Sequence, residues 1–382
     1  YLVYEAEHHP SDWTQRAFRQ ADQVVFVVAS TTAPQVSEFE TRLMREPGSV
    51  IKRRHLVVTY PAAAHQPHEV GRWRRSRHVE RVYPVRERHH GDYARLARFL
   101  NGTPVGLVLG GGGARGFAHL GVIRALHECG VAIDLIGGNS MGALIGAQYA
   151  SEFALDDIIE RTRRFALGGE RPTLPLISLM SGKRVERDLK KMFGDAQVDG
   201  LWRPYFASAC NLSKGCTVVQ ESGPMWRAVL ASNSPAGLFP PVLIQGDLLV
   251  DGAILENVPV SAMRARLGSP QEKRRGNGTI IAVDVDVQQD LCVHADMARL
   301  SVWGTLKGLV RPGLARNPGI GEILYRAGHM GGLSQRARAV AQSDHYLEPP
   351  VGKFPIMGYR SAASIVEVGY RYAMEKVSQW ER

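Results

Sequence analysis

Two stretches of the chain decide the fold: VGLVLGGGGARG at residues 105–116 and AIDLIGGNSMG at residues 132–142. Each begins as an apolar run of strand length and passes directly into glycines. Each is followed by apolar residues at helical spacing, over residues 117–128 after the first stretch and 143–149 after the second. The order strand, glycine turn, helix therefore occurs twice in succession, which is typical of a parallel sheet with crossover helices. We predict an α/β fold.

The composition is that of a globular protein with an excess of positive charge. The 382 residues are 44% hydrophobic and 22% charged, and the net charge is +10, which favours an anionic partner such as membrane headgroups, nucleic acid or an acidic ligand. Nine arginines lie between Arg72 and Arg98, against three acidic residues. This run is typical of either a solvated linker or a membrane-facing surface. No aromatic stacking motif accompanies it, so nucleic acid is not expected as a partner.

Cysteine and histidine spacing gives no sign of a metal centre. The four cysteines form no CxxC pair and are predicted to be reduced. The two His-Glu pairs cannot form a zinc motif, because Arg72 and Val131 stand where a second histidine is needed. No stretch resembles a signal peptide or is long enough to span a bilayer. We therefore expect a cytoplasmic protein, soluble or peripheral to a membrane, with no metal or other cofactor.

The chain divides into four predicted segments. Residues 1–60 alternate strand and helix patterns, starting with a strand at Tyr1–Glu7, and are predicted to be a small partial α/β region. Residues 61–103 are predicted to be a basic linker with a short helix. Residues 104–265 hold the glycine motifs and are predicted to be the catalytic core, which residues 266–382 complete with strands and amphipathic helices. Because the chain begins inside a predicted strand, we expect it to be part of a longer protein.

Gly138-x-Ser140-x-Gly142 fits the nucleophile elbow, in which a serine stands on a sharp turn between a strand and a helix. Glycines are needed on both sides because backbone approaches the serine closely there. The helix that begins at the serine favours negative charge developing on the serine oxygen. The alternative is a glycine-rich turn that only packs the helix on the strand. The strand–turn–helix context favours Ser140 as a nucleophile.

The glycine run from Gly111 to Gly116 allows three interpretations. It fits the dinucleotide fingerprint G-x-G-x-x-G, but no acidic residue stands at the end of the next strand, since Asp134 lies within or before that strand. It can also direct backbone amides at an oxyanion, and it lies beside Ser140 if the two strands are adjacent and parallel. We favour the oxyanion hole, with a nucleotide cradle and a plain turn as alternatives. The residues predicted to form this hole are Gly111, Gly112, Gly113 and Arg115, where Arg115 either steadies the loop or meets a phosphate group.

The general base is harder to identify. A Ser–His–acid triad needs a histidine on a loop after the serine, and none of His294, His329 and His345 stands in such a context. Asp251 follows a short apolar strand and precedes Gly252, so its carboxylate can reach a neighbouring serine. Aspartate is a weak base, with an ordinary pKa of about 3.9, so a dyad requires desolvation or a mainly orienting role. An ordinary Asp-Gly turn is the alternative, and the residues alone leave both open.

Taken in this order, the motifs resemble those of the patatin-like phospholipases. The glycine run at 111–116, the elbow at 138–142 and Asp251-Gly252-Ala253 carry the resemblance. Other stretches are similar to the neuropathy target esterase branch of lysophospholipases, and together they extend over nearly the whole chain. These stretches are WTQR at 13–16, RQAD at 19–22, VGLVL at 105–109, LWRPYF at 201–206, FPP at 239–241 and ENVP at 256–259.

The resemblance implies a three-layer α/β/α fold with a mainly parallel central sheet, preceded by the small partial α/β region. It implies a dyad of Ser140 as nucleophile and Asp251 as base, which deacylates lysophospholipids, phospholipids or related glycerol esters without a metal or nucleotide in the active site. Contact with a membrane surface is a separate hypothesis, which rests on the arginine run and on the amphipathic C-terminal helices. The resemblance also implies an upstream cyclic-nucleotide-binding module in the full-length protein. Asn139 departs from the family pattern, which commonly has threonine there. A nucleotide-binding regulatory module and a catalytically silent lipid-binding scaffold are the alternative functions. The glycines that complete the motifs are Gly116, Gly138, Gly142 and Gly252.

Overall fold

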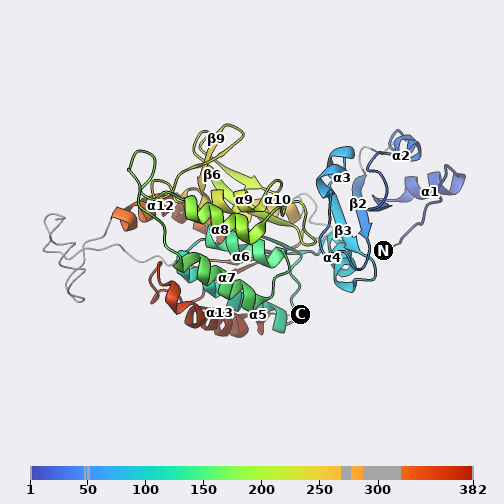
Figure 1. Cartoon of the computed structure of the whole chain (residues 1–382). Helices are drawn as coiled ribbons and strands as arrows, with labels where there is room; N and C mark the ends of the chain where they lie inside the picture. Colours follow the sequence, from blue (N-terminus) through green and yellow to red (C-terminus); the bar gives the residue numbers. More distant parts are fainter. Residues whose placement is uncertain (1, 47–48, 50–51, 268–276, 287–319, 381–382) are drawn as a thin grey trace, which may run out of the picture. The chain divides into compact units, whose positions relative to one another are not determined.

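The computed structural model describes residues 2–46, 49, 52–267, 277–286 and 320–380 (Figure 1). The chain folds as two compact units, each with its own sheet. The first unit comprises residues 1–100 with 199–202, and the second comprises residues 101–198 with 203–382.

The first unit is a parallel sheet with helices packed around it. Its elements are α1 (Asp12–Gln20), β1 (Gln23–Ala29), α2 (Glu38–Leu43), β2 (Arg53–Tyr60), α3 (Val70–Ser76), β3 (Arg81–Arg86) and α4 (His90–Asn101). The strand order is β1-β2-β3, and both pairs are parallel. The central strand β2 is largely buried, whereas exposed and half-buried residues alternate along the outer strand β1. This difference is expected because only the central strand is flanked on both sides.

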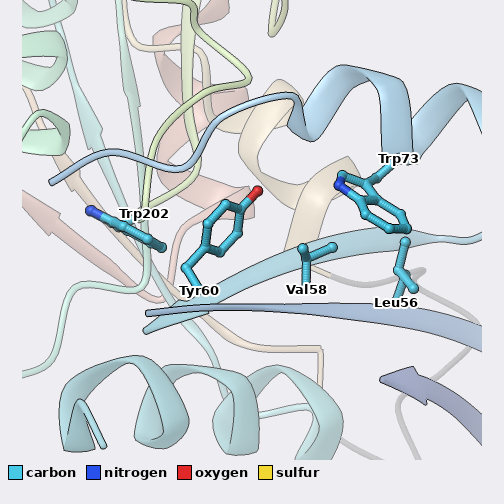
Figure 2. Packing of buried hydrophobic residues seen from close by; sticks show 5 residues of the cluster. All are labelled: Leu56, Val58, Tyr60, Trp73 and Trp202. Carbon is cyan, nitrogen blue, oxygen red and sulfur yellow. The ribbon is translucent and has the colours of Figure 1, made fainter. Parts of the chain in front are cut away.

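An aromatic cluster forms the core of this unit (Figure 2). The ring of Tyr60 meets that of Trp202 edge-on, with centroids 5.3 Å apart, which is a favourable aromatic geometry. The polar ends of both rings are satisfied: the hydroxyl of Tyr60 donates to the carbonyl of His68 at 2.7 Å, and the indole of Trp202 donates to that of His65 at 3.0 Å. The buried members of the cluster are Leu56, Val58, Tyr60, Trp73 and Trp202.

The segment predicted to be a basic linker is folded instead. Residues 61–88 contain α3 and β3, so the linker prediction is wrong. Arg86 and Arg95 each donate to the buried carboxylate of Asp92 at 2.8 Å. Burial opposes the ionisation of Asp92, but the hydrogen bonds from Arg86 outweigh it and lower its pKa to about 2. The strand predicted at Tyr1–Glu7 is also wrong, since residues 2–7 belong to no strand.

The second unit is built on a largely parallel sheet. Its strands are β4 (Val105–Leu109), β5 (Leu135–Gly138), β6 (Tyr205–Asn211), β7 (Cys216–Gln220), β8 (Val242–Ile244), β9 (Asp247–Asp251), β10 (Thr279–Val283) and β11 (His345–Leu347). The order is β11-β10-β4-β5-β6-β9-β8, with β7 paired to β6. The pairs from β11 to β6 are parallel, and β7, β8 and β9 pair antiparallel. Because β4 and β5 are adjacent and parallel, which was the condition for the glycine run to lie beside Ser140, the two glycine motifs that follow them lie at one edge of the sheet.

Helices pack against this sheet to give the three-layer α/β/α fold that the family resemblance implies. The helices are α5 (Ala118–Glu128), α6 (Met141–Ala150), α7 (Leu155–Leu167), α8 (Lys183–Phe193), α9 (Met225–Ser232), α10 (Val260–Leu267), α12 (Ile320–Gln342) and α13 (Ala362–Val377), and the 3₁₀ turns are η2 (Gly113–Phe117), η3 (Gly252–Ile254) and η5 (Tyr359–Ser361). Helices α5 and α13 approach closely because glycines face each other. A Cβ on Gly121 would lie 3.0 Å from the carbonyl carbon of Gly369.

Some boundaries differ from the sequence predictions. The strand expected at residues 132–136 lies at β5, so it includes two glycines of the turn, and the helix expected from Phe117 is preceded by η2. Gly130 follows the end of α5 with a φ of +71°, a left-handed conformation typical of the residue after a helix. Of the strands and helices predicted for residues 266–382, the structure describes β10, β11, α12 and α13, and residues 287–319 lie outside the described residues. In the part of the chain that the structure describes, every helix is too short or too polar to cross a bilayer.

Candidate active site

Ser140 stands at the tip of a sharp turn between β5 and α6. Its backbone has a φ of +51° and a ψ of −125°, a conformation that residues with a side chain rarely adopt. The amide of Asn139 donates to the carbonyl of Leu109 at 3.0 Å, and the amide of Gly142 donates to the carbonyl of Asn139 at 2.9 Å. The strand–turn–helix context predicted from the sequence is present, and its serine has the strained backbone of a nucleophile elbow.

The glycines on both sides of the serine are required by close backbone contacts. A Cβ on Gly138 would lie 2.6 Å from the carbonyl oxygen of Leu109, and one on Gly142 would lie 2.6 Å from the carbonyl carbon of the same residue. Real Cβ atoms do not come this close to backbone atoms, so no side chain fits at either position. The turn is therefore pressed against the end of β4.

The glycine run lies directly beside the serine. It follows β4, and a Cβ on Gly111 would lie 3.0 Å from the Cβ of Ser140. Gly113 has a φ of +54°, which favours glycine. The run continues through η2 into α5, so its amides precede the positive end of a helix.

The amide of Gly111 bonds to a side chain of the ENVP stretch, which contributed to the family resemblance but to which the sequence assigned no site role. It donates to Oδ1 of Asn257 at 3.1 Å, and Nδ2 of Asn257 donates to the carbonyl of Gly111 at 3.3 Å. Asn257 is buried. Gly111 was predicted to contribute its amide to the oxyanion hole, but that amide already has an acceptor. Within the described residues, the amides of Gly112 and Gly113 have none.

Arg115 and Gly116 fix the glycine run rather than extend into the site. The Nε of Arg115 donates to the carbonyl of Phe354 at 2.8 Å, and the amide of Ala114 donates to the carbonyl of Ile356 at 2.7 Å. The side chain of Arg115 is buried. A Cβ on Gly116 would overlap Met141 at the start of α6. Of the two roles considered for Arg115, steadying the loop therefore agrees with its contacts.

The loop that carries Asp251 is bonded to the turn that carries the serine. Asp251 ends β9, is buried, and its Oδ1 accepts from the amide of Ala253 at 3.0 Å. The amide of the next residue, Gly252, donates to Oδ1 of Asn139 at 3.1 Å, and a Cβ on Gly252 would lie 2.6 Å from that oxygen. The neighbour of the candidate base therefore contacts the neighbour of the candidate nucleophile.

A segment after α9 contacts both loops, and no sequence motif predicted it. The Nδ2 of Asn233 donates to the carbonyl of Ser140 at 2.8 Å, and the carbonyl of Ser234 accepts from the amide of Asp251 at 2.9 Å. The hydroxyl of Ser232 accepts from the amide of Ser140 at 2.9 Å. These residues lie more than eighty positions from the elbow, and nothing in their local pattern signals such contacts.

The described histidines do not contact the serine turn as a third triad member would. Of the three candidates, His294 lies outside the described residues and the side chain of His329 is not described. His345 stacks on Trp380 with ring centroids 3.8 Å apart. His119, for which the sequence predicted no role, bonds through Nε2 to the carbonyl of Gly110 at 2.8 Å, and burial lowers its pKa to about 4. It is therefore neutral at pH 7 and supports the glycine run.

No group of three histidine, cysteine or acidic side chains that could hold a metal ion occurs among the residues that the structure describes.

The interpretation of the glycine run as a nucleotide cradle requires an acidic residue at the end of the next strand, and Asp134 does not fill that position. Asp134 precedes β5 and is buried, and its Oδ2 accepts from the amide of Val105 at 3.0 Å. It therefore does not stand at the end of a strand where a ribose would be bound.

Two known protein families match parts of the chain. The patatin-like phospholipase family matches residues 107–264, the region that holds Ser140 and Asp251. The chain carries a patatin-like phospholipase domain. Ahead of this patatin-like domain, residues 1–84 match the neuropathy target esterase family P-loop like domain, which accounts for most of the first unit.

Three relatives match nearly the whole chain. It is 30% identical over 408 residues to neuropathy target esterase sws of Drosophila melanogaster, covering 96% of this chain and 28% of that protein. It is 31% identical over 422 residues to patatin-like phospholipase domain-containing protein 6 of Homo sapiens, covering 100% and 30%. It is 30% identical over 436 residues to lysophospholipase NTE1 of Mycosarcoma maydis, covering 97% and 22%. The chain thus spans less than a third of the length of these relatives.

Among solved structures, the chain is similar to VipD from Legionella pneumophila, with a TM-score of 0.36 and 14% identity over 72% of this chain and 66% of that chain.

Proposed function

We propose that the patatin-like domain is a serine esterase that hydrolyses acyl ester bonds of lysophospholipids and phospholipids. The observation that carries the proposal is the meeting of three loops that lie far apart in the sequence. The glycine run lies against Ser140, and the loop of Asp251 is bonded to Asn139. The names of the relatives, which include a lysophospholipase and a phospholipase domain, support a lipid ester as the substrate.

In the proposed mechanism, Asp251 accepts the hydroxyl proton of Ser140 while the serine oxygen attacks the ester carbonyl carbon. The tetrahedral intermediate expels the alcohol, which takes the proton from Asp251, and the acyl group stays on Ser140. Water then gives a proton to Asp251 and attacks the acyl carbon. The serine oxygen recovers that proton as the fatty acid leaves. The carboxylate is buried, so water competes little for it.

We propose that the amides of Gly112 and Gly113 stabilise the oxyanion. The amide of Gly111 donates to Asn257 instead, and this bond holds the glycine run in place. Each donor aimed at the developing charge contributes about 3 kcal/mol to transition-state stabilisation. The start of α6 at Ser140 adds the favourable end of its helix dipole. Arg115 acts in this proposal by fixing the loop to Phe354 and not by contacting substrate.

The test combines active-site labelling with two substitutions. A fluorophosphonate should modify Ser140, as identified by peptide mass spectrometry. Ser140→Ala should remove labelling and lower kcat for a short-chain ester at least about a thousandfold, because the nucleophile is lost. Asp251→Asn should also lower kcat strongly while leaving substrate binding intact, because the proton acceptor is lost.

Ser151→Ala is the matched control, because the hydroxyl of Ser151 only bonds to the carbonyl of Ala147 at the end of α6. It should keep both labelling and turnover. Unchanged turnover in Ser140→Ala would refute the esterase. Unchanged turnover in Asp251→Asn would mean that another residue, such as a histidine, is the base. A chain that neither labels nor turns over, but is thermally stabilised by a dinucleotide, would favour the nucleotide-binding alternative.

A further inference from the structure

The loop between α7 and α8 is coloured green in Figure 1. It exposes three neighbouring aliphatic side chains. The exposed fractions of Leu174, Leu176 and Ile177 are 78%, 88% and 75%. Clustered exposure of this kind is unfavourable in water and typical of a surface that meets an apolar phase. We propose that residues 171–181, called the docking loop below, bind the surface of an anionic phospholipid membrane. This inference rests on the proposed lipid esterase function.

The docking loop has an ordered base beneath its apolar tip. The amide of Thr173 donates to the carbonyl of Leu179 at 3.0 Å. The hydroxyl of Ser178, which is buried, donates to the carbonyl of Met180 at 2.7 Å. Residues 174–177 therefore remain in solvent although the residues around them are hydrogen-bonded. The exposure belongs to a folded loop and not to a frayed end.

The base of the docking loop is bonded to the segment that borders the serine. The amide of Leu179 donates to the carbonyl of Gly237 at 2.9 Å. The amide of Met180 donates to the carbonyl of Leu238, also at 2.9 Å. A few residues before Gly237, Asn233 donates to the carbonyl of Ser140 at 2.8 Å. The segment 233–238 thus bonds to the base of the docking loop at one end and to the serine turn at the other.

The charge around the docking loop suits anionic headgroups. From Glu160 to Lys191 there are nine lysines and arginines against four acidic residues. Arg171 at the base of the loop, and Lys183 and Arg187 one turn apart on α8, are exposed. Basic residues beside an apolar tip favour a surface that combines negative headgroups with acyl chains.

Part of the arginine run considered for membrane contact in the sequence is used inside the first unit. Arg77 is buried and bonds to Glu40 at 2.9 Å, and Arg86 bonds to buried Asp92. These guanidinium groups are used within the first unit. The docking loop, in contrast, combines exposed charge with exposed apolar side chains in one stretch.

The proposal is tested by vesicle sedimentation in the Ser140→Ala background, so that lipid is not consumed. The triple substitution Leu174→Ser, Leu176→Ser, Ile177→Ser should bind mixed phosphatidylcholine and phosphatidylserine vesicles at least about tenfold more weakly than its parent. Binding of the parent should weaken as salt rises and should be lower on pure phosphatidylcholine vesicles, because headgroup attraction is screened or absent.

Val27→Ser is the matched control, since Val27 is an aliphatic residue on β1 with a 65% exposed side chain. It should bind vesicles like the parent. Full vesicle binding by the triple variant, or no binding by the parent, would overturn the proposal that the docking loop binds membranes. So would a loss of self-association in size-exclusion chromatography with vesicle binding unchanged, because the loop would then contact a second copy. Vesicle sedimentation does not depend on turnover. A lack of esterase activity in the unsubstituted chain would therefore contradict the proposed function without affecting the test of the docking loop.

Discussion

At the scale of single residues, two asparagines organise the candidate site. Asn139 receives hydrogen bonds from the hydroxyl of Ser232 at 3.2 Å and the amide of Gly252 at 3.1 Å. Asn257 forms two hydrogen bonds to the backbone of Gly111. Each side chain therefore joins two loops that are distant in sequence. The sequence marked Asn139 only as a departure from threonine, because the partners of an amide side chain are set by tertiary contacts.

We predict that Asn257→Ala lowers kcat about tenfold to a hundredfold with little change in KM, because the support of the glycine run is lost while the substrate contacts remain. Leaving the buried amide of Gly111 without an acceptor should also cost about 1–3 kcal/mol of stability. Steady-state kinetics and urea unfolding check both effects.

The matched control for this prediction is Asn211→Ala. Asn211 is also buried, and its side chain bonds to Asp247 and to the amide of Lys214. The control should lose comparable stability but keep its kcat. If both variants lose activity equally, the effect of Asn257 is one of general stability and not of loop position.

At the scale of helices and strands, the glycine motifs made the central sheet predictable. Two successive strand–turn–helix patterns put the glycine run beside Ser140 on the condition that β4 and β5 are parallel neighbours, and the structure shows this pairing. The strand β3 was missed because its sequence RVYPVR contains proline and two arginines. It lies at the edge of its sheet, where a missing amide is tolerated. The strand expected at Tyr1–Glu7 failed because alternation alone does not provide a pairing partner.

The packing of α5 on α13 supplies a prediction at this scale. We expect Gly121→Ala to lower the free energy of unfolding by about 1–3 kcal/mol, because the added methyl would overlap the backbone of α13 near Val366 and Tyr370. Gly91→Ala in α4 is the control, since its Cβ would meet only the side chain of His89. Thermal unfolding followed by circular dichroism compares the two, and equal stability of both variants would argue against close packing of these helices.

At the scale of the whole molecule, two units with separate cores share one chain. The first unit depends on the carboxylate of Asp92, which bonds to Arg86 and Arg95. The pKa of Asp92 is lowered from 3.8 to about 2 in the folded state. Its contribution to stability is therefore complete above pH values near 4 and is lost as the pH falls through about 2.

We predict that Asp92→Asn destabilises the first unit by about 2 kcal/mol at neutral pH, and that the loss shrinks on acidification because the parent carboxylate then becomes protonated as well. Hydrogen-exchange protection of the β2 amides in urea, at neutral and acidic pH, reports on this unit. Glu87→Gln, at an exposed position, should show no such pH-dependent difference. A constant difference between Asp92→Asn and its parent at all pH values would contradict the linkage.

The strained backbone of Ser140 lowers the stability of the fold at the position that the proposed reaction requires. A residue with a side chain at a φ of +51° and a ψ of −125° carries roughly 1–3 kcal/mol of unfavourable conformational energy. Glycine would relax that peptide unit and firm up the fold, yet it would remove the oxygen on which the proposed chemistry depends. The most stable variant at this position is therefore expected to be inactive, and the active chain to be less stable.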